Sequence, residues 1–389
     1  MESPPMLDDI TVLNLASVGP AARAARTLAD YGATVIQVGP LAPKGSVQIQ
    51  PPFHTYGAGR GLKHVSINMK SDEGREGFLR LADNADVIIE SFRPGVVDRL
   101  GIGYDTVFER NRGIVYCSTT GYGQDGPAST WAGHDINYLA MSGFLACTEP
   151  RGDGGPPIPG ATVADSAGGG MHAAMSIMAA LIRRGATGKG SYLDVSATEG
   201  VLSLMALAVD QYLATGEVAG PRQVLLTGRY AFYDVYPTKD DKWVSVGAIE
   251  PKFFANLCNL LGLGEYAKSQ MDDAKQDEIR EAFRKAFLTK TRDEWTDELA
   301  AADTCVAPVL TIPEVVEQPH FEARKIFMQA HHAEHGDFKQ VSHILAGGDR
   351  EQPLHEVTPF GHSDAAELLA TAGYSAEEIE ELNEQGAIA

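Results

Sequence analysis

Compact apolar runs alternate with helical stretches over the first 120 residues, and this alternation constrains the fold more than any other feature of the chain. The apolar runs lie at 10–15, 33–38, 86–92 and 113–118. A turn at Gly19 and Pro20 precedes an Ala-rich helical stretch at 21–31, and Ser71 starts a further helix that ends near residue 85. Apolar strands joined by helices favour a parallel sheet that is covered on both faces. The sequence therefore predicts an α/β fold.

The pattern changes after a helix at 171–184 that Gly185 ends, a strand at 191–195 and a long helix at 198–215. Runs at 230–236 and 243–246 flank a polar turn and predict an antiparallel hairpin. The length of 389 residues also exceeds one ordinary core. We predict a large Rossmann-like domain whose first part is 6–200, a linker helix at 201–228, a small α+β domain at 229–318, and a return connector with the C-terminal part of the large domain at 319–389.

The formal net charge is −20, from 32 basic and 52 acidic residues. This balance argues against a broad surface for nucleic acid or for an anionic membrane. No apolar run approaches the ~18 residues of a membrane span. The four cysteines are scattered, without a Cys-x-x-Cys pair. We expect a folded protein of the cytoplasm with no nucleic-acid or membrane partner.

An anionic ligand of so acidic a chain needs a local basic pocket. Arg60 and Lys63 lie around a Gly-rich turn, and Arg93 follows the apolar run at 86–92. Side chains of this kind can hold phosphate groups. The alternative interpretation is ordinary surface charge.

Two candidate proton carriers, His134 and Asp165, lie at the edges of Gly-rich segments between residues 121 and 170. Histidine titrates near neutrality, and the pKa of a carboxyl group in a closed site can rise into the same range. The pair is therefore a candidate for acid/base catalysis. Asp165 also directly precedes a predicted helix, so the alternative is that it caps the free N–H groups of that helix.

Three consecutive glycines, Gly168 to Gly170, open the predicted helix. They can let a ligand approach the backbone amides, or they can serve close helix packing. They do not form the dinucleotide fingerprint, so a nicotinamide cofactor is not supported. His331 and His335 are spaced as on one helical face, but no further ligand follows at a typical spacing. We expect neither a metal nor a redox cofactor.

Several motifs spread over nearly the whole chain occur together. They are Gly19-Pro20, 28–33 (Leu-Ala-Asp-Tyr-Gly-Ala), 92–96 (Phe-Arg-Pro-Gly-Val), 121–127 (Gly-Tyr-Gly-Gln-Asp-Gly-Pro), 133–138 (Gly-His-Asp-Ile-Asn-Tyr), 188–190 (Gly-Lys-Gly) and 246–251 (Val-Gly-Ala-Ile-Glu-Pro). As a set they resemble the family III CoA-transferases of the CaiB/BaiF type, and within these the α-methylacyl-CoA racemases.

This resemblance implies a doubly wound large domain built from both ends of the chain and a small domain built from the middle. It also implies an interlocked homodimer in which an acyl-CoA thioester lies between the large domain of one subunit and the small domain of the other. Coenzyme A would enter as part of the substrate, with no further cofactor.

The resemblance also assigns roles to residues. Asp165 would carry the acyl group as a mixed anhydride in a transferase, or act as one of two bases in a racemase. His134 would be the second base, supported by Glu250. Asp135 is included among the catalytic candidates, while Tyr138 and Gly168 join the basic residues as candidates for binding the substrate.

The sequence departs from the family pattern in two places. Gln37 to Pro40 replace a basic and an acidic residue at the end of the second strand, and Arg229 stands within a motif that is usually Asp-Gly-Gly. A guanidinium at Arg229 can bind a carboxylate of a dicarboxylic acyl group, or it can point to solvent.

We expect a racemase or epimerase of 2-methylacyl-CoA thioesters, an enzyme of lipid metabolism. One alternative is a CoA-transferase that uses Asp165 as nucleophile. Another is a non-catalytic subunit of a heteromeric transferase, because the contacts to CoA at 37–40 are weakened. The acyl group itself is not specified by the sequence.

Overall fold

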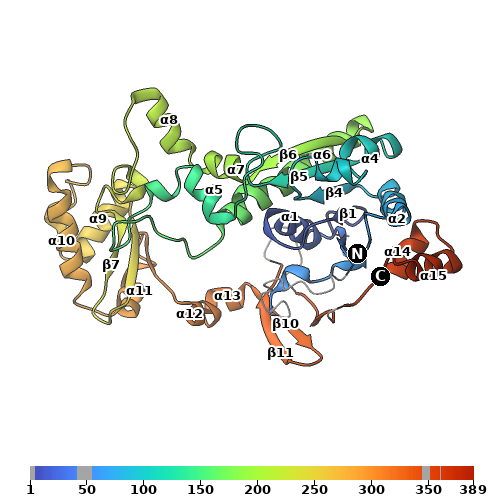
Figure 1. Ribbon diagram of the computed structural model, residues 1–389. Coiled ribbons are helices and arrows are strands. Elements are labelled where there is room, and N and C mark those ends of the chain that lie inside the picture. The colour runs from blue at the N-terminus through green and yellow to red at the C-terminus, as the bar shows by residue number, and fades with distance from the viewer. Residues whose placement is uncertain (1–4, 42–54, 344–350, 360) are drawn as a thin grey trace. The chain divides into compact units, whose positions relative to one another are not determined.

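The computed structural model describes residues 5–41, 55–343, 351–359 and 361–389 (Figure 1). These residues form two compact units. The first unit lies within 1–142, 159–204 and 319–389, and the second comprises 143–158 and 205–318. The segment 143–158, which the sequence-based division left in the large domain, groups with the second unit. The predicted boundaries of independently folding domains stay a prediction.

A six-stranded parallel sheet forms the centre of the first unit, with the strand order β3-β2-β1-β4-β5-β6. Its strands are β1 (Thr11–Asn14), β2 (Thr34–Gly39), β3 (Lys63–Ser66), β4 (Val87–Glu90), β5 (Val115–Thr120) and β6 (Ser191–Ser196). The prediction of a parallel sheet is confirmed. The strand order reverses between β1 and β4, and in open α/β sheets ligands bind beyond the carboxyl ends of the strands at such a point.

Helices cover both faces of this sheet. Residues of α1 (Gly19–Asp30) and α6 (His172–Thr187) pack on one face, and residues of α2 (Asp72–Asp83), α4 (Tyr104–Arg110), α14 (Ala365–Thr371) and α15 (Ala376–Glu384) pack on the other. The first unit also contains α3 (Val96–Arg99), α5 (Asp135–Met141), α7 (Ala197–Leu204) and α13 (Pro319–Ala323). Successive strand residues point to opposite faces, so Val12 and Leu13 of β1 belong to two different cores. Leu28 of α1 joins the core of Val12, and Phe78 of α2 joins that of Leu13.

The C-terminal segment packs on the first unit. Leu369 of α14, Leu382 of α15 and Ile388 are buried in the same core as Phe78, and Ile388 forms an antiparallel bridge with Ile67. Ser375 caps α15 by accepting a hydrogen bond from the backbone N–H of Glu378 at 3.2 Å. The C-terminal residues thus share a core with α2 of the first unit.

Three helix boundaries differ from the sequence-based expectation. Gly19 and Pro20 are not a separate turn but the first residues of α1, where proline fits because it needs no N–H partner. Gly185 lies inside α6, which ends at Gly188 with φ of +69°. The helix expected at 198–215 is divided into α7 and α8 (Ala206–Thr215) at Met205.

Part of the predicted return connector is a hairpin. Strands β10 (Phe327–His332) and β11 (Gly336–Val341) pair antiparallel, and β12 (His355–Glu356) lies parallel to β10. His331 and His335 therefore do not share a helical face, and His331 instead contacts Asp337 at 2.6 Å. Among the residues that the structure describes, no three His, Cys, Asp or Glu side chains gather as metal ligands do.

The second unit contains the predicted hairpin. Strands β7 (Tyr233–Pro237), β8 (Trp243–Gly247) and β9 (Val306–Pro308) form an antiparallel sheet, accompanied by α8, α9 (Pro251–Leu260), α10 (Gln276–Phe287), α11 (Arg292–Leu299) and α12 (Ile312–Val316). Its core is aromatic, with Tyr236, Phe254, Phe283 and Phe287 fully buried. In neither unit does the described part of the chain include a helix long and apolar enough to cross a membrane.

Candidate active site

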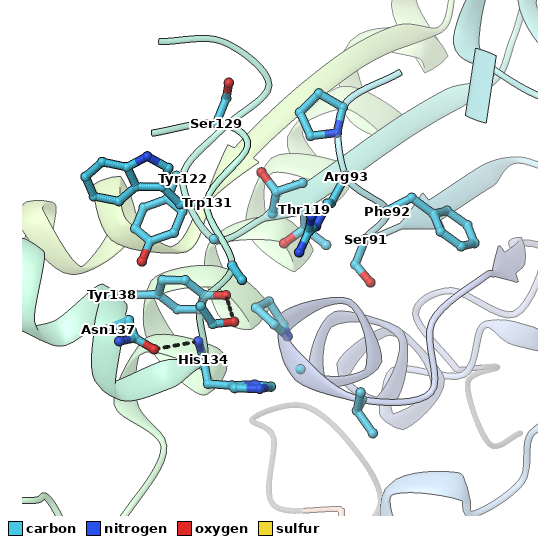
Figure 2. Close-up of a pocket in the computed structure, with 18 residues that line it drawn as sticks. Ser91, Phe92, Arg93, Thr119, Tyr122, Ser129, Trp131, His134, Asn137 and Tyr138 are labelled. Carbon is cyan, nitrogen blue, oxygen red and sulfur yellow. Dashed lines mark hydrogen bonds between the residues drawn. The ribbon is translucent and has the colours of Figure 1, made fainter. Parts of the chain in front are cut away.

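A pocket of about 500 Å³ opens at the carboxyl ends of β1, β4 and β5, at the point where the strand order reverses (Figure 2). It is lined by residues 18–20, 91–94, 119–122, 129, 131–134, 137 and 138. All of these belong to the first unit. The position agrees with the general rule for ligand sites in open α/β sheets.

An aromatic row forms one wall of this pocket. The ring of Tyr122 lies edge-on to Trp131 at 5.8 Å and to Tyr138 at 5.1 Å. The hydroxyl group of Tyr138 donates a hydrogen bond to the carbonyl of Gly133 at 2.6 Å. A Cβ atom at Gly121 would lie only 2.2 Å from the Tyr138 ring, so the glycine is required by close approach. The row offers flat apolar surface to a ligand.

His134 directly precedes α5 and lines the pocket. Its backbone N–H donates to the side-chain oxygen of Asn137 at 3.0 Å, which fixes the start of the helix. The imidazole is exposed, and Figure 2 shows it pointing away from the ring of Tyr138. The cap thus holds the backbone of His134 while its ring stays accessible to a ligand.

Asp165 lies in a π-helix, η3 (Ala164–Met171), that continues into α6. Short π-helical segments are rare and occur frequently at functional sites. Asp165 is a helical residue and its side chain does not cap α6, because that helix begins seven residues later, at His172. The alternative interpretation of Asp165 as the cap of the following helix is therefore wrong. Its side chain is half-buried.

The environment of Asp165 favours the protonated carboxyl group. Burial raises its pKa above the usual range, and the negative charge of Asp135 raises it further. The charges of Arg23 and His134 act in the opposite direction. A carboxyl group with a raised pKa is suited to donating and accepting protons near neutral pH.

Asp135 connects the two candidate bases. It is the first residue of α5, next to His134, and its carboxylate accepts a hydrogen bond from the backbone N–H of Asp165 at 2.9 Å. This bond ties α5 to the π-helix η3. The structure therefore brings His134, Asp135 and Asp165 together, although only His134 of the three lines the pocket. Their catalytic roles stay a prediction.

The three glycines of η3 serve close packing. A Cβ atom at Gly168 would lie 2.7 Å from the carbonyl oxygen of Ala197, and one at Gly169 would lie 2.5 Å from Cβ of Pro20. At Gly170 the nearest atom would be Cβ of Arg23, at 2.5 Å. The structure thus supports the packing interpretation, with η3 wedged between α1 and α7. Binding of substrate at Gly168 stays a prediction.

The three predicted basic residues do not gather at one place. Arg93 is exposed and lines the pocket. Arg60 is 7% exposed and donates hydrogen bonds to the carbonyl of Val341 and to His343. Lys63 forms an ion pair with Glu367. Arg93 alone is therefore placed to meet a ligand in this pocket.

Gln37, one of the departures from the family pattern, is engaged within the sheet. Its side-chain oxygen accepts a hydrogen bond from the amide of Asn14 at 2.8 Å, and its amide donates to the backbone carbonyl of Asn14 at 3.1 Å. The side chain thus joins β2 to β1 and is not directed at a ligand.

Two predicted site residues belong to the second unit. Glu250 is exposed and directly precedes α9. Arg229 forms an ion pair with Asp273 at 3.0 Å, and its guanidinium lies 5.2 Å from the ring centre of Tyr230. Support of His134 by Glu250, and binding of an acyl group by Arg229, stay predictions.

Sequence reasoning missed Trp131 and Arg23. Trp131 lies only three residues before His134, so an aromatic residue in a Gly-rich stretch was an available signal. Arg23 acts on Asp165 because η3 packs against α1, and this long-range contact leaves no local trace in the sequence.

The chain is similar to known proteins over nearly its whole length. A model of CoA-transferase family III matches residues 7–362. An α-methylacyl-CoA racemase from Homo sapiens is 35% identical over 380 residues, which cover 97% of this chain and 96% of that protein. An acetyl-CoA:oxalate CoA-transferase from Acetobacter aceti is 29% identical over 336 residues, covering 83% and 85%. A CaiB/BaiF family protein from Brucella suis has a crystal structure that matches with a TM-score of 0.70 at 28% identity, covering 84% of this chain and 89% of that chain.

Proposed function

This chain belongs to CoA-transferase family III, and we propose that it racemises 2-methylacyl-CoA thioesters by moving a proton on and off the α-carbon. The observation that carries the proposal is the placement of Asp165 beside Asp135 and His134 in the first unit, with a carboxyl group whose pKa burial raises. The similarity to an α-methylacyl-CoA racemase supports the same reaction.

Inversion of an α-carbon needs one group to remove the proton from one face and another to return a proton to the opposite face. In the proposed reaction, neutral His134 accepts the α-proton and the electron pair passes into the thioester carbonyl, which gives an enolate. Protonated Asp165 then donates its proton to the other face of the α-carbon. For the opposite enantiomer the two groups exchange roles.

The pocket supplies surfaces that fit an acyl-CoA thioester. The aromatic row of Trp131, Tyr122 and Tyr138 suits an apolar chain, and exposed Arg93 suits a phosphate group. Coenzyme A is part of the substrate in this proposal, and the reaction calls for no separate cofactor.

A homodimer is part of the proposal. Met171 of η3 and Met175 and Ile182 of α6 are exposed apolar side chains in the first unit. In the second unit, Leu207 and Leu213 of α8 are exposed as well. Apolar surface of this kind is typical of an interface, and we propose that a second copy of the chain covers it and brings Glu250 and Arg229 to the site. Location in the cytoplasm stays a prediction.

Transfer of CoA between carboxylic acids is the second candidate, and the similarity to an acetyl-CoA:oxalate CoA-transferase favours it. There the Asp165 carboxylate would attack the thioester carbonyl, form a mixed anhydride and release CoA as thiolate. A nucleophilic carboxylate must be ionised, whereas burial and Asp135 favour the protonated form of Asp165. Protonated Asp165 is the form that the racemase reaction needs when His134 removes the α-proton, so in that direction the environment of Asp165 agrees with the first candidate.

Isotope exchange distinguishes the two reactions. The protein is incubated with (R)- or (S)-2-methylacyl-CoA in deuterated water, and α-deuterium uptake is followed by mass spectrometry and configuration by chiral analysis. The proposal expects deuterium uptake with inversion from both enantiomers. Absence of uptake, together with movement of CoA from succinyl-CoA to a free acid, would overturn it in favour of the transferase.

A further inference from the structure

A second pocket, of about 320 Å³, lies at the opposite end of α1 from the candidate active site. Gly19 and Pro20, at the N-terminus of α1, line the first pocket, whereas Arg26 and Ala29, in its C-terminal half, line the second. No residue lines both pockets. The second pocket is completed by the loop at 60–61 and by the segment 352–356 beside β10.

Two buried arginines form the floor of this second pocket. The side chain of Arg26 is 12% exposed and that of Arg60 is 6% exposed. Both contact Asp30, which is the only carboxylate with an ion pair to either guanidinium among the residues that the structure describes. Within the described part of the chain, two arginines and one aspartate leave one positive charge without an ion-pair partner. Burial of an unpaired charge is costly.

The histidines beside the arginines do not add charge near neutral pH. The Nε atom of Arg60 donates to Nε2 of His343 at 3.2 Å, so this imidazole accepts a hydrogen bond in its neutral form. Its Nε2 atom also lies 3.3 Å from Asp30. Burial lowers the pKa of His343 to about 4, and it lowers the pKa of His355 as well. The surplus charge therefore belongs to the arginines.

Arg26 is incompletely paired. Its Nη1 atom donates to the carbonyls of Gly57 and Arg60, and its Nη2 atom pairs with Asp30. Its Nε atom is buried and has no hydrogen-bond partner. Burial and the charge of Arg60 lower the pKa of Arg26 to about 9. A buried donor without a partner calls for an explanation such as a missing ligand.

We propose that this second pocket binds the carboxylate of a small organic acid, with Arg26 and Arg60 as partners of the anion. The apolar part of the acid would lie against Ala29, Met328 and Leu354, which line the pocket. A carboxylate carries one negative charge and matches the single surplus positive charge of the floor. A phosphate dianion would exceed that charge, and Glu356 at the rim would repel it more strongly than it repels a monoanion.

Butyrate is a suitable probe, since it combines a carboxylate with a short apolar chain. Binding is measured by ligand-observed NMR, with the full chain saturated by a non-reactive thioether analogue of an acyl-CoA so that the first pocket is occupied. We expect Arg26→Met to weaken butyrate binding about tenfold or more, because it removes a charged donor and keeps the apolar stem. Arg80→Met, which alters a half-buried arginine on α2 that does not line the second pocket, is the matched control and should leave binding unchanged.

A second pair of variants avoids the arginines, whose loss can affect folding. Leu354 is 52% exposed, so its replacement should not disturb the core. We expect Leu354→Glu to weaken butyrate binding severalfold, and more strongly at low salt, whereas Leu354→Gln should have little effect. These measurements do not use enzymatic activity, so they remain valid whatever reaction the first pocket catalyses.

Two results would overturn the proposal. One is butyrate affinity that is unchanged in both Arg26→Met and Leu354→Glu. The other is binding of inorganic phosphate, but not of butyrate, with the same dependence on Arg26, which would assign the pocket to phosphate groups.

Discussion

The charged groups beside the two pockets at the ends of α1 differ in sign, with carboxyl groups in excess beside the first pocket and arginines in excess at the second. At the candidate active site, two carboxyl groups, Asp165 and Asp135, lie together and the pKa of Asp165 is raised. In the second pocket, two arginines surround one carboxylate and the pKa of His343 is lowered to about 4. Burial favours the neutral form in both cases. Burial therefore shifts Asp165 towards its protonated form and His343 towards its neutral form, so the same physical effect suits one site to proton transfer and the other to an anion.

Removal of the acid should have the largest effect. We expect Asp165→Asn to lower the rate of α-proton exchange by about 10²- to 10⁴-fold, the usual contribution of a positioned acid or base. The exchange rate is measured by mass spectrometry in deuterated water. Asp125→Asn, in the exposed Gly-rich loop, is the matched control and should keep the wild-type rate. A rate within threefold of wild type for Asp165→Asn would remove Asp165 from the chemistry.

The second pocket should make the protein sensitive to acid. The folded-state pKa of His343, about 4, lies below its ordinary value of 6.5, so folding favours the neutral ring. This contribution to stability is complete above pH 6.5 and is lost as the pH falls towards 4. This direction follows from the linkage between proton binding and folding.

Chemical denaturation between pH 7 and pH 4 measures this effect. We expect the free energy of unfolding to fall less steeply in His343→Gln than in wild type, because glutamine keeps a polar side chain that does not titrate. His320→Gln, on the exposed helix α13, serves as control. Parallel pH profiles for His343→Gln and wild type would contradict the assignment.

The aromatic wall of the first pocket should tolerate little change. We expect Gly121→Ala to destabilise the fold by about 1–3 kcal/mol, since its Cβ atom would lie 2.2 Å from the Tyr138 ring and force it to move. The KM for acyl-CoA should rise in the same variant. Gly160→Ala, where a Cβ atom has no neighbour within 4 Å, is the control. Denaturation curves and steady-state kinetics of both variants measure the difference.

The smallest expected effect is on stability and comes from Asp165. Its ionisation lowers stability as the pH rises, whereas protonation of His343 lowers stability as the pH falls. Because the folded-state pKa of Asp165 is raised, its ionisation costs stability once the pH exceeds the ordinary aspartate value, and the cost is complete above the folded-state pKa. Asp165→Asn should therefore be more stable than wild type at pH 7, and this advantage should disappear near pH 3. Thermal unfolding across this range tests the sign. An advantage that grows towards low pH would contradict it.

The strands of the sheet could be predicted because each can be identified from its own residues, without knowledge of distant contacts. Residues 87–89 of β4 are apolar and point to both faces of the sheet, which is typical of a central parallel strand. Ser71 is a helix cap that needs no distant partner. The end of α6 was not predictable in the same way. Gly185 and Gly188 are both possible stops, and only Gly188 adopts the left-handed conformation.

The candidate proton carriers could be predicted from the sequence, whereas the packing contacts around them could not. His134 and Asp165 stand out as residue types in Gly-rich segments. The π-helix that holds Asp165 depends on contacts of Gly168 with Ala197 and of Gly169 with Pro20, which join segments distant in sequence. For the same reason Arg60, predicted to accompany Arg93, is engaged in the second pocket through Val341 and His343.

A shared helix also constrains how the sequence of this protein can vary. Arg23, whose charge acts on Asp165, and Arg26 and Asp30, which build the second pocket, all project from α1. Each residue of an α-helix advances the side-chain direction by about 100°. Deletion of one residue near Ala24 would therefore turn Arg26 and Asp30 out of register with Arg23. Substitutions can alter the two pockets separately. A change in the length of α1 would instead change the orientation of Arg26 and Asp30 relative to Arg23, and so affect both pockets at once.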